Sequence, residues 1–366
     1  MSNARKLADN LPTEGQLGNR NILINGAHQV SQRHGSSSVT VAANDHFVVD
    51  RFKIQDYSDA TFSSQQVTDA PEGFRNSSKI TVTGTDTSLG TTQYQRFVQP
   101  IEGLNVSHLN YGWSFAQTTT LSFHVKSSLT GTFYVFAFNS AANRAFVSAY
   151  TIDTANTWEK KIIKITGDQG GTWLKDNGVG MYLGWSLGTG TNFQTSTLDA
   201  WQGSFEMAGS NQVNFAGTNG ATWQVTGCQL EVGSQASPFE HEPVGVTLSK
   251  CQRYTHIIGD TQYQALGIGA MYTATNGIFY VHTPVPMRST PSVSKTVDGN
   301  TVWLQSYVGS SGLNSNPTPQ LGENSTNGRQ NNFRIYVPSS NNSTTAGYSS
   351  WNQVMPNASL ILEAEL

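Results

Sequence analysis

The chain has 366 residues, of which only 12% are charged and 10% are aromatic, and its formal net charge is −3. Disordered chains are poor in aromatic residues and rich in charge, so this composition predicts an ordered protein whose polarity comes from Ser, Thr, Asn and Gln. These residue types favour strands and turns over exposed helices. The absence of a basic stripe argues against nucleic acid as a partner. No apolar run approaches the ~18 residues of a membrane-spanning helix, which argues against membrane insertion.

Residues 1–20 are polar and aperiodic, which predicts an N-terminal arm. Short β-branched and aromatic runs then recur between turn residues as far as residue 232. Leu121, Phe123 and Val125 alternate with polar residues, whereas residues 132–138 (TFYVFAF) are apolar on both faces and predict a central strand. Many short strands at this spacing are typical of an all-β sandwich or barrel.

The last strand of this series, residues 222–232, contains an irregularity that has a structural meaning. Trp223 and Val225 point to one face, and Cys228 and Leu230 share that face only if one extra residue intervenes. Gly227 is the natural place for such a β-bulge, because a bulge residue often adopts a conformation that favours glycine. We therefore predict a bulge at Gly227.

A second β-domain is predicted after a linker. Residues 233–249 contain two prolines and no periodicity, so we expect a linker at 241–250 between a first domain at 21–240 and a smaller C-terminal β-domain at 251–366. Two polar stretches interrupt the second domain, Gly309–Asn332 and Ser339–Ala346. Stretches as long as the first one are usually functional or disordered.

The sequence offers little for metal or redox chemistry. Cys228 and Cys251 are the only cysteines, too few for a disulfide framework in a chain of this length, so we expect buried free thiols. In an extended FEHEP segment, Glu240 and Glu242 point the same way and His241 points the opposite way, which does not suit zinc.

Enzyme signatures are also missing from the sequence. It has no GxSxG, Walker A, CxxC or strand-associated GxGxxG motif. Carboxylates such as Asp168 and Asp176 are candidates for glycoside cleavage only if the fold sets the separation that this reaction needs. We therefore predict a protein that is not an enzyme, with no catalytic residues and no cofactor.

Several segments together resemble a family of phage virion proteins that is common among phages of marine and cyanobacterial hosts. The segments are GNRNILINGAHQVSQRHG, VDRFKI, TDAPEGF, LSFHVKSSLTGTF, WEKKIIKITGD, LGWSLGTGTNFQ and TWQVTGCQLEVGSQASPFEHEPVGVTLSKCQRY, within residues 19–254. The resemblance implies a jelly-roll domain similar to carbohydrate-binding modules over residues 21–240. A structural calcium ion is the metal such a module implies, although the sequence does not place its ligands.

The same resemblance implies a biological setting. It implies a homotrimeric tail-fibre or receptor-binding protein, assembled in the host cytoplasm and exposed on the virion after lysis. The arm at residues 1–20 is then expected to contact other virion proteins, and a host surface glycan is the expected ligand. Two alternatives remain open at this point. The first is a capsid decoration or fibre-assembly protein, which the short arm favours. The second is a polysaccharide depolymerase.

Sugar-binding proteins place flat aromatic rings against the apolar faces of pyranoses, so exposed aromatics are the candidate ligand contacts. Trp173 and Trp201 lie in polar loop contexts, GGTWLKD and LDAWQGS, where each alternatively pins its own loop to the sandwich. In the second domain, aromatics flank the two polar stretches, and polar loops with aromatic anchors suit adaptable recognition. These residues are Trp303, Tyr307, Tyr348 and Trp351. We expect the main binding site there, with a tolerated insertion or a subunit contact as the alternatives.

Overall fold

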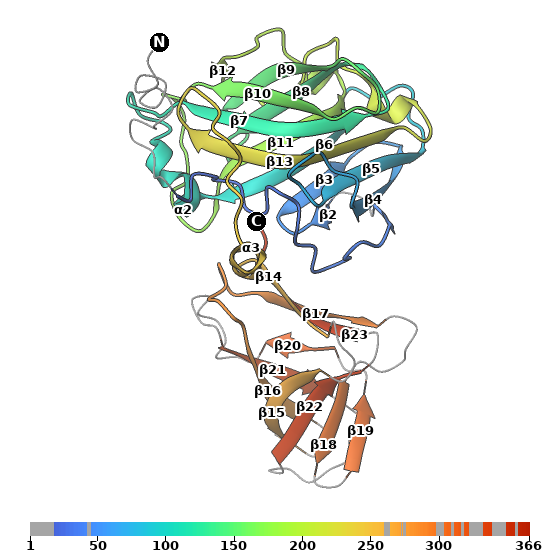
Figure 1. Cartoon of the computed structure of the whole chain (residues 1–366). Helices are drawn as coiled ribbons and strands as arrows, with labels where there is room; N and C mark the ends of the chain where they lie inside the picture. The colour runs from blue at the N-terminus through green and yellow to red at the C-terminus, as the bar shows by residue number, and fades with distance from the viewer. Residues whose placement is uncertain are drawn as a thin grey trace. The chain divides into compact units, whose positions relative to one another are not determined.

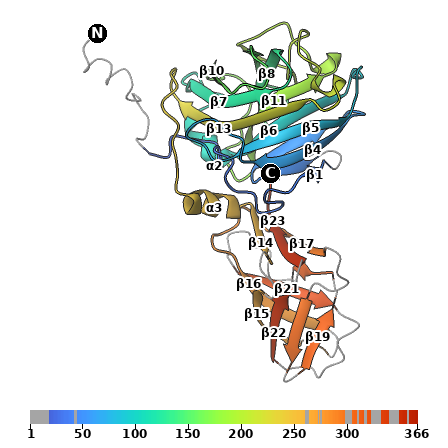
Figure 2. The same cartoon turned by 45° about the vertical axis from the view of Figure 1, so that its right-hand side comes forward.

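The computed structural model describes residues 18–41, 45–259, 264–271, 273, 276–297, 304–308, 311–315, 318–321, 332–338, 349–355 and 358–366. The chain divides into two compact units, Met1–Thr247 with Leu366 and Leu248–Glu365 (Figures 1 and 2). The predicted all-β class is confirmed, since the α-helices among the described residues are only α2 (Gly103–Val106) and α3 (Val244–Gln252). No helix in this part of the chain has both the length and the apolar character needed to span a membrane.

The first unit is a sandwich of two antiparallel sheets. One sheet has the order β1 (Val39–Thr40), β4 (Thr61–Val67), β5 (Ser77–Gly84), β13 (Thr222–Val232), β7 (Thr119–Ser127) and β10 (Glu159–Ile165). The other has the order β12 (Trp201–Gln202), β9 (Ala145–Ile152), β8 (Gly131–Phe138), β11 (Val179–Thr189), β6 (Tyr94–Glu102), β3 (Phe52–Asp56) and β2 (His46–Val49).

The side chains of β8 explain why its sequence is apolar on both faces. Phe133 and Val135 belong to the core between the sheets, where Trp185 and Trp223 are fully buried. Tyr134 and Phe136 point to the outer face of the seven-stranded sheet, where the segment 193–208 covers them with a second apolar cluster. The strand lies between β9 and β11, so the predicted central position is confirmed.

The predicted bulge is also confirmed. The pairing of β13 with β7 shifts register between Thr226 and Gln229, and Gly227 has a φ of 62°. The extra residue keeps Trp223, Val225, Cys228 and Leu230 on the core side of the sheet. Cys228 and Cys251 are buried free thiols, as the cysteine count predicted.

The segment 241–250, which we predicted as a linker, contains most of a helix. Helix α3 begins at Val244, directly after Pro243, and ends at Gln252. The pattern did not predict this helix because it lacks a clear apolar face, with Val244 59% and Val246 44% exposed. Proline at the start of a helix costs no hydrogen bond, so Pro243 is compatible with this position.

The second unit contains two antiparallel sheets around its own core. The three-stranded sheet has the order β14 (Thr255–Ile258), β23 (Ala358–Glu363) and β17 (Ser292–Val297). The larger sheet has the order β19 (Ser311–Ser315), β18 (Leu304–Val308), β22 (Ser349–Val354), β15 (Ala265–Met271), β16 (Asn276–His282), β21 (Asn332–Pro338) and β20 (Gln320–Leu321). Alternate residues of β21 and β23 fill the core, including Phe333, Ile335, Leu360 and Leu362.

Two short strands fall inside the stretch Gly309–Asn332 that we interpreted as an unpatterned loop. They are β19 and β20, the edge strands of the larger sheet. They pair with β18 and β21 through the backbone, which requires no apolar pattern in the sequence. The residues 309–310, 316–317 and 322–331 of that stretch, and all of Ser339–Ala346, lie outside the described residues.

Candidate functional site

The sandwich exposes a group of large apolar side chains beside helix α2. Trp113 and Phe115 are each 56% exposed, and their ring centroids are 5.7 Å apart. Leu104 is 52% exposed and Leu174 37% exposed, and Nζ of Lys175 lies 5.5 Å from the centroid of the Trp113 ring. We call these five residues the aromatic ledge. Exposed apolar groups that cluster in this way mark interaction surfaces.

The ledge is held by backbone hydrogen bonds to neighbouring loops. The N–H of Gly112 donates to the carbonyl of Asp168 at 2.8 Å, and the N–H of Gln117 donates to the carbonyl of Leu109 at 2.8 Å. The side chain of Gln169 donates to the carbonyl of Ser114 at 3.2 Å. The loop that carries the two exposed rings is therefore held by hydrogen bonds at several positions, which limits the conformational entropy lost when a ligand binds.

A layer of buried rings supports the ledge from below. Tyr111 contacts Trp173 edge to face at 4.9 Å and Trp201 at 5.6 Å, and the two tryptophans contact each other at 5.2 Å. Tyr111 also lines a small hollow with Val106, Trp173, Leu174, Lys175 and Met181. Burial raises the pKa of Tyr111, so the phenol stays neutral.

Trp173 and Trp201, which the sequence suggested as ligand contacts, lie together in this supporting layer. Trp173 is only 7% exposed, and its indole N–H donates to Asp168 at 3.1 Å. Trp201 is half-buried, and its N–H donates to the carbonyl of Thr166. Both placements correspond to the alternative in which a loop tryptophan pins its own loop to the sandwich.

The two exposed rings, Trp113 and Phe115, were not among the residues that the sequence suggested. The criterion that selected Trp173 and Trp201 was an aromatic residue in a polar loop context. That criterion fits Trp113 and Phe115 equally well, because they lie in the segment NYGWSFAQ. A loop has no periodicity that separates a buried ring from an exposed one, so only the structure distinguishes the two pairs.

The candidates of the C-terminal domain are only partly described. Trp303 and Tyr348 lie outside the described residues. Tyr307 lies in β18 and Trp351 in β22, and the two are direct partners in the register of these strands. The structure thus brings the two positions together on neighbouring strands.

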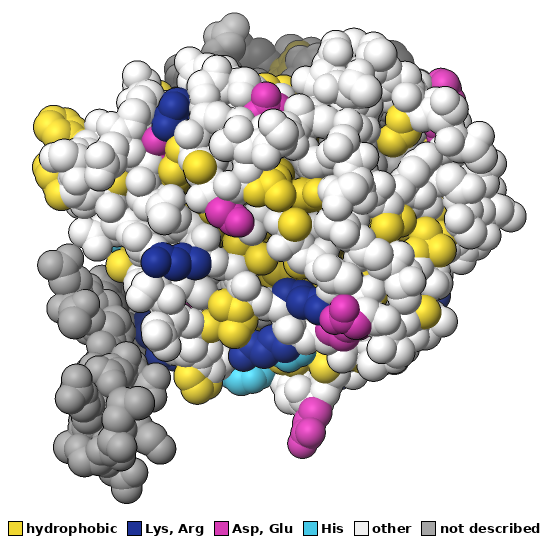
Figure 3. All heavy atoms as spheres, turned by 90° about the horizontal axis from the view of Figure 1, so that it is seen from above, with side chains coloured by type: hydrophobic (Ala, Val, Ile, Leu, Met, Phe, Trp, Pro, Cys, Tyr) yellow, Lys and Arg dark blue, Asp and Glu magenta, His cyan; other side chains and the backbone are white. Residues whose placement is uncertain are grey.

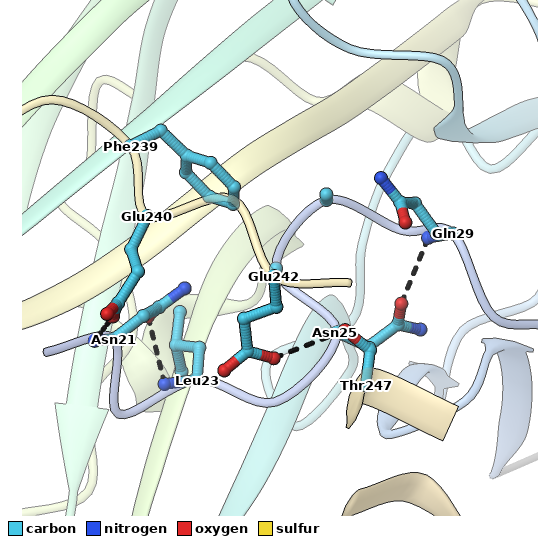
Figure 4. A pocket seen from close by; sticks show the side chains of 10 residues that line it. Asn21, Leu23, Asn25, Gln29, Phe239, Glu240, Glu242 and Thr247 are labelled. Carbon is cyan, nitrogen blue, oxygen red and sulfur yellow. Dashed lines mark hydrogen bonds between the residues drawn. The ribbon is translucent and has the colours of Figure 1, made fainter. Parts of the chain in front are cut away.

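The segment after β13 lines a second hollow together with residues 21–29 (Figure 4). Glu240 accepts a hydrogen bond from the backbone N–H of Asn21 at 2.9 Å, and Glu242 accepts one from the hydroxyl of Thr247 at 3.2 Å. His241 instead contacts the rings of Phe74 and Phe239, so Glu240 and Glu242 share one side, as expected for an extended chain. No group of three or more His, Cys, Asp or Glu side chains gathers for a metal ion within the described ranges.

Asp168 and Asp176 serve the local structure. Asp168 is 1% exposed and accepts two hydrogen bonds from Arg144, one from Nε at 2.9 Å and one from Nη2. Asp176 accepts the N–H of Gly178 at 2.8 Å, two residues further along its own loop.

Figure 3 shows one face of the molecule on which the backbone and side chains that are neither hydrophobic nor charged predominate. Apolar side chains and a few charged ones are scattered between them.

No protein-family model matches the chain, and no curated protein matches it. Among solved structures, it is similar to the enzymatically active domain of bacteriophage CBA120 tailspike protein 4, with a TM-score of 0.32, 11% identity and 58% of this chain covered. The chain spans only 22% of that tailspike chain. It is also similar to a CBM4 structure, with a TM-score of 0.30, 14% identity, and coverage of 57% of this chain and 98% of the other. A family 11 carbohydrate-binding module of the Clostridium thermocellum cellulase Lic26A-Cel5E gives a TM-score of 0.28, 14% identity, and coverage of 54% and 100%.

Proposed function

We propose that the sandwich binds a glycan without catalysis and that the aromatic ledge is its contact surface. The observation that carries this proposal is the pair Trp113 and Phe115, each 56% exposed on a loop that hydrogen bonds hold in place. Aromatic ring faces bury large areas, and a pyranose ring offers an apolar face of similar width. Lys175, together with the exposed Ser114 and Gln169, supplies donors for hydroxyl groups at the rim.

We further propose that this binding serves attachment of a virion to a host surface. The resemblance of residues 19–254 to phage virion proteins supports a tail-fibre or receptor-binding adhesin. A homotrimer suits this role because several weak sites on one particle give strong overall attachment. The role requires no cofactor. Asp168 does not support the polysaccharide-cleaving alternative, because its carboxylate is already paired with the guanidinium of Arg144.

A structural role in a virion is the second candidate, and one observation favours it. Leu104 and Leu174 extend the ledge with aliphatic side chains, which suit a protein partner at least as well as a sugar. In that case the ledge would join this protein to another capsid or fibre component.

The test compares the double variant Trp113→Ala/Phe115→Ala with the wild-type chain in binding to host-cell polysaccharide and to purified glycans. Trp158→Ala is the matched control, because Lys126 Nζ also lies over the Trp158 ring, at 5.3 Å. Lys126 is at the end of β7 opposite to the ledge, so the control leaves the ledge untouched.

The expected result is at least a tenfold loss of glycan affinity in the double variant and none in the control. Retained glycan binding in a folded double variant would refute the ledge as the contact surface. Loss of virion assembly with unchanged glycan binding would favour the structural role.

A further inference from the structure

The outer face of the seven-stranded sheet contains a buried arginine enclosed by aromatic rings. The guanidinium carbon of Arg96 lies 4.9 Å from the ring centroid of Tyr94 and 5.1 Å from that of Phe138. It lies 5.6 Å from the centroid of Phe205 and 5.8 Å from that of Phe136. We call Arg96 and these four rings the arginine cage. Arg96 is 6% exposed, so water solvates little of its charge.

No carboxylate forms an ion pair with this guanidinium in the part of the chain that the structure describes. Nε donates to Oε1 of Gln55 at 2.7 Å, and Nη1 contacts Sδ of Met207 at 3.4 Å. Arginine has five N–H donors, so these contacts leave Nη2 without an acceptor among the described residues. The neighbouring carboxylate of Asp45 is engaged elsewhere, by Nζ of Lys53 at 3.4 Å and by Nε2 of Gln55.

This arrangement is unusual because proteins normally pair a buried charge. Removing an ion from water costs several kcal/mol, and buried charges are kept where a partner compensates them. Ring faces recover part of this cost through cation–π attraction. They do not supply the in-plane acceptors that a guanidinium fork requires, and a carboxylate does supply them.

The rim of the cage offers ring surfaces beside this cation. Tyr57 is 41% exposed and lies 4.7 Å from Tyr94 between ring centroids, with the two rings tilted by 37°. Tyr182 stacks on Phe138 at 4.7 Å. Phe205 lies between β12 and β13, outside any strand, and is only half-buried. Hence a sugar ring can lie against the tyrosines while a substituent reaches Arg96.

From this geometry we infer that the arginine cage is a binding site for the carboxylate of an acidic sugar, a uronic acid, separate from the aromatic ledge. The inference rests on the proposed glycan-binding function and extends it to a chemical class of ligand. The planar carboxylate accepts two hydrogen bonds from the guanidinium, and the tyrosine rings hold the pyranose. The carboxylate of the ligand thus forms the ion pair that Arg96 lacks among the described residues.

The experiment uses ligands that differ only in this charge. Binding of the full chain is measured by calorimetry with homogalacturonan and alginate oligosaccharides and with the same oligosaccharides after esterification of their carboxylates. We expect the acid forms to bind at least tenfold more tightly than the esters. Equal affinity for acid and ester would overturn the inference while leaving the proposed function intact, and binding of neither form would overturn the inference as well.

Two variants locate the effect. Arg96→Gln removes the charge and should abolish the difference in affinity between acid and ester. Arg96→Lys keeps the charge but cannot donate two parallel hydrogen bonds to one carboxylate, so it should retain only part of that difference. Trp113→Ala on the ledge should leave the ratio of acid to ester affinity unchanged. A ratio that survives in folded Arg96→Gln would contradict the assignment to the cage. If Arg96→Gln does not fold, the comparison of ligands on the wild-type chain and Arg96→Lys still decides.

Discussion

Asp168 and Arg144 form a buried ion pair directly behind the aromatic ledge. The carboxylate accepts hydrogen bonds from two nitrogens of the guanidinium, and the backbone carbonyl of the same aspartate accepts the N–H of Gly112. One residue thereby connects the ion pair to the loop that presents Trp113.

Replacing Arg144 with Met should destabilise the sandwich by about 3 kcal/mol, because it leaves the 1% exposed Asp168 without its partner. Urea unfolding followed by tryptophan fluorescence measures this change. The control is Asp153→Asn, which removes only the pair between Lys161 and an aspartate that is 70% exposed and should change stability by less than about 1 kcal/mol. Equal effects of the two substitutions would show that the buried pair contributes little.

A methyl group at Gly112 should displace the ledge without altering its exposed rings. Gly112 has a φ of 87°, and an added Cβ would lie 2.9 Å from the carbonyl oxygen of Gly171. We expect Gly112→Ala to weaken glycan binding at least fivefold. Gly220→Ala is the control, because it has a similar φ of 74° with nothing within 4 Å and so introduces only the backbone strain, roughly 1 kcal/mol. Unchanged binding in Gly112→Ala would mean that the position of the ledge does not matter.

The sequence predicted those features that depend on periodicity. Alternation along a strand identifies the buried face, and a break in it identifies a bulge, so the sandwich strands and Gly227 could be predicted. The ledge could not be predicted, because Trp113 and Trp173 have similar local sequences and differ only in their tertiary surroundings. The arginine cage could not be predicted either, since only Tyr94 shares the strand of Arg96 and the other three rings come from β8 and from the segment 193–208.

The bulge gives a direct test of that reasoning. Gly227→Ala should destabilise the sandwich by about 2 kcal/mol, because the φ of 62° is strained for alanine and the new Cβ would lie 2.6 Å from the ring of Phe74. Gly73→Ala provides the comparison, since its φ of 87° is also positive but nothing lies within 4 Å. Thermal and urea unfolding of the two variants should therefore rank Gly227→Ala as clearly less stable. The opposite ranking would contradict a structural requirement for glycine in the bulge.

The stability of the sandwich should fall in mild acid because of His28. This imidazole is fully buried, and its Nδ1 lies 2.7 Å from Oγ of Ser78. Burial lowers its pKa from 6.5 to about 3. Between these values the unfolded chain binds a proton that the folded chain does not, so stability is lost as the pH falls. From pH 6.5 to pH 4 the loss amounts to about 3 kcal/mol, at about 1.4 kcal/mol per unit.

Replacing His28 with Asn should remove this dependence, and Asn tolerates the φ of 52° at this position. The free energy of unfolding is measured at pH 7, 5.5 and 4 for the wild type, His28→Asn and His241→Asn. We expect His28→Asn to be less stable than the wild type at pH 7, since it loses core packing. On going to pH 4, however, its free energy of unfolding should fall by about 3 kcal/mol less than that of the wild type. Carboxylates protonate in all three proteins, so the difference isolates His28. His241→Asn, at an exposed position, is the control for the substitution of a histidine by asparagine. Parallel curves for His28→Asn and the wild type would show that His28 does not control the acid sensitivity.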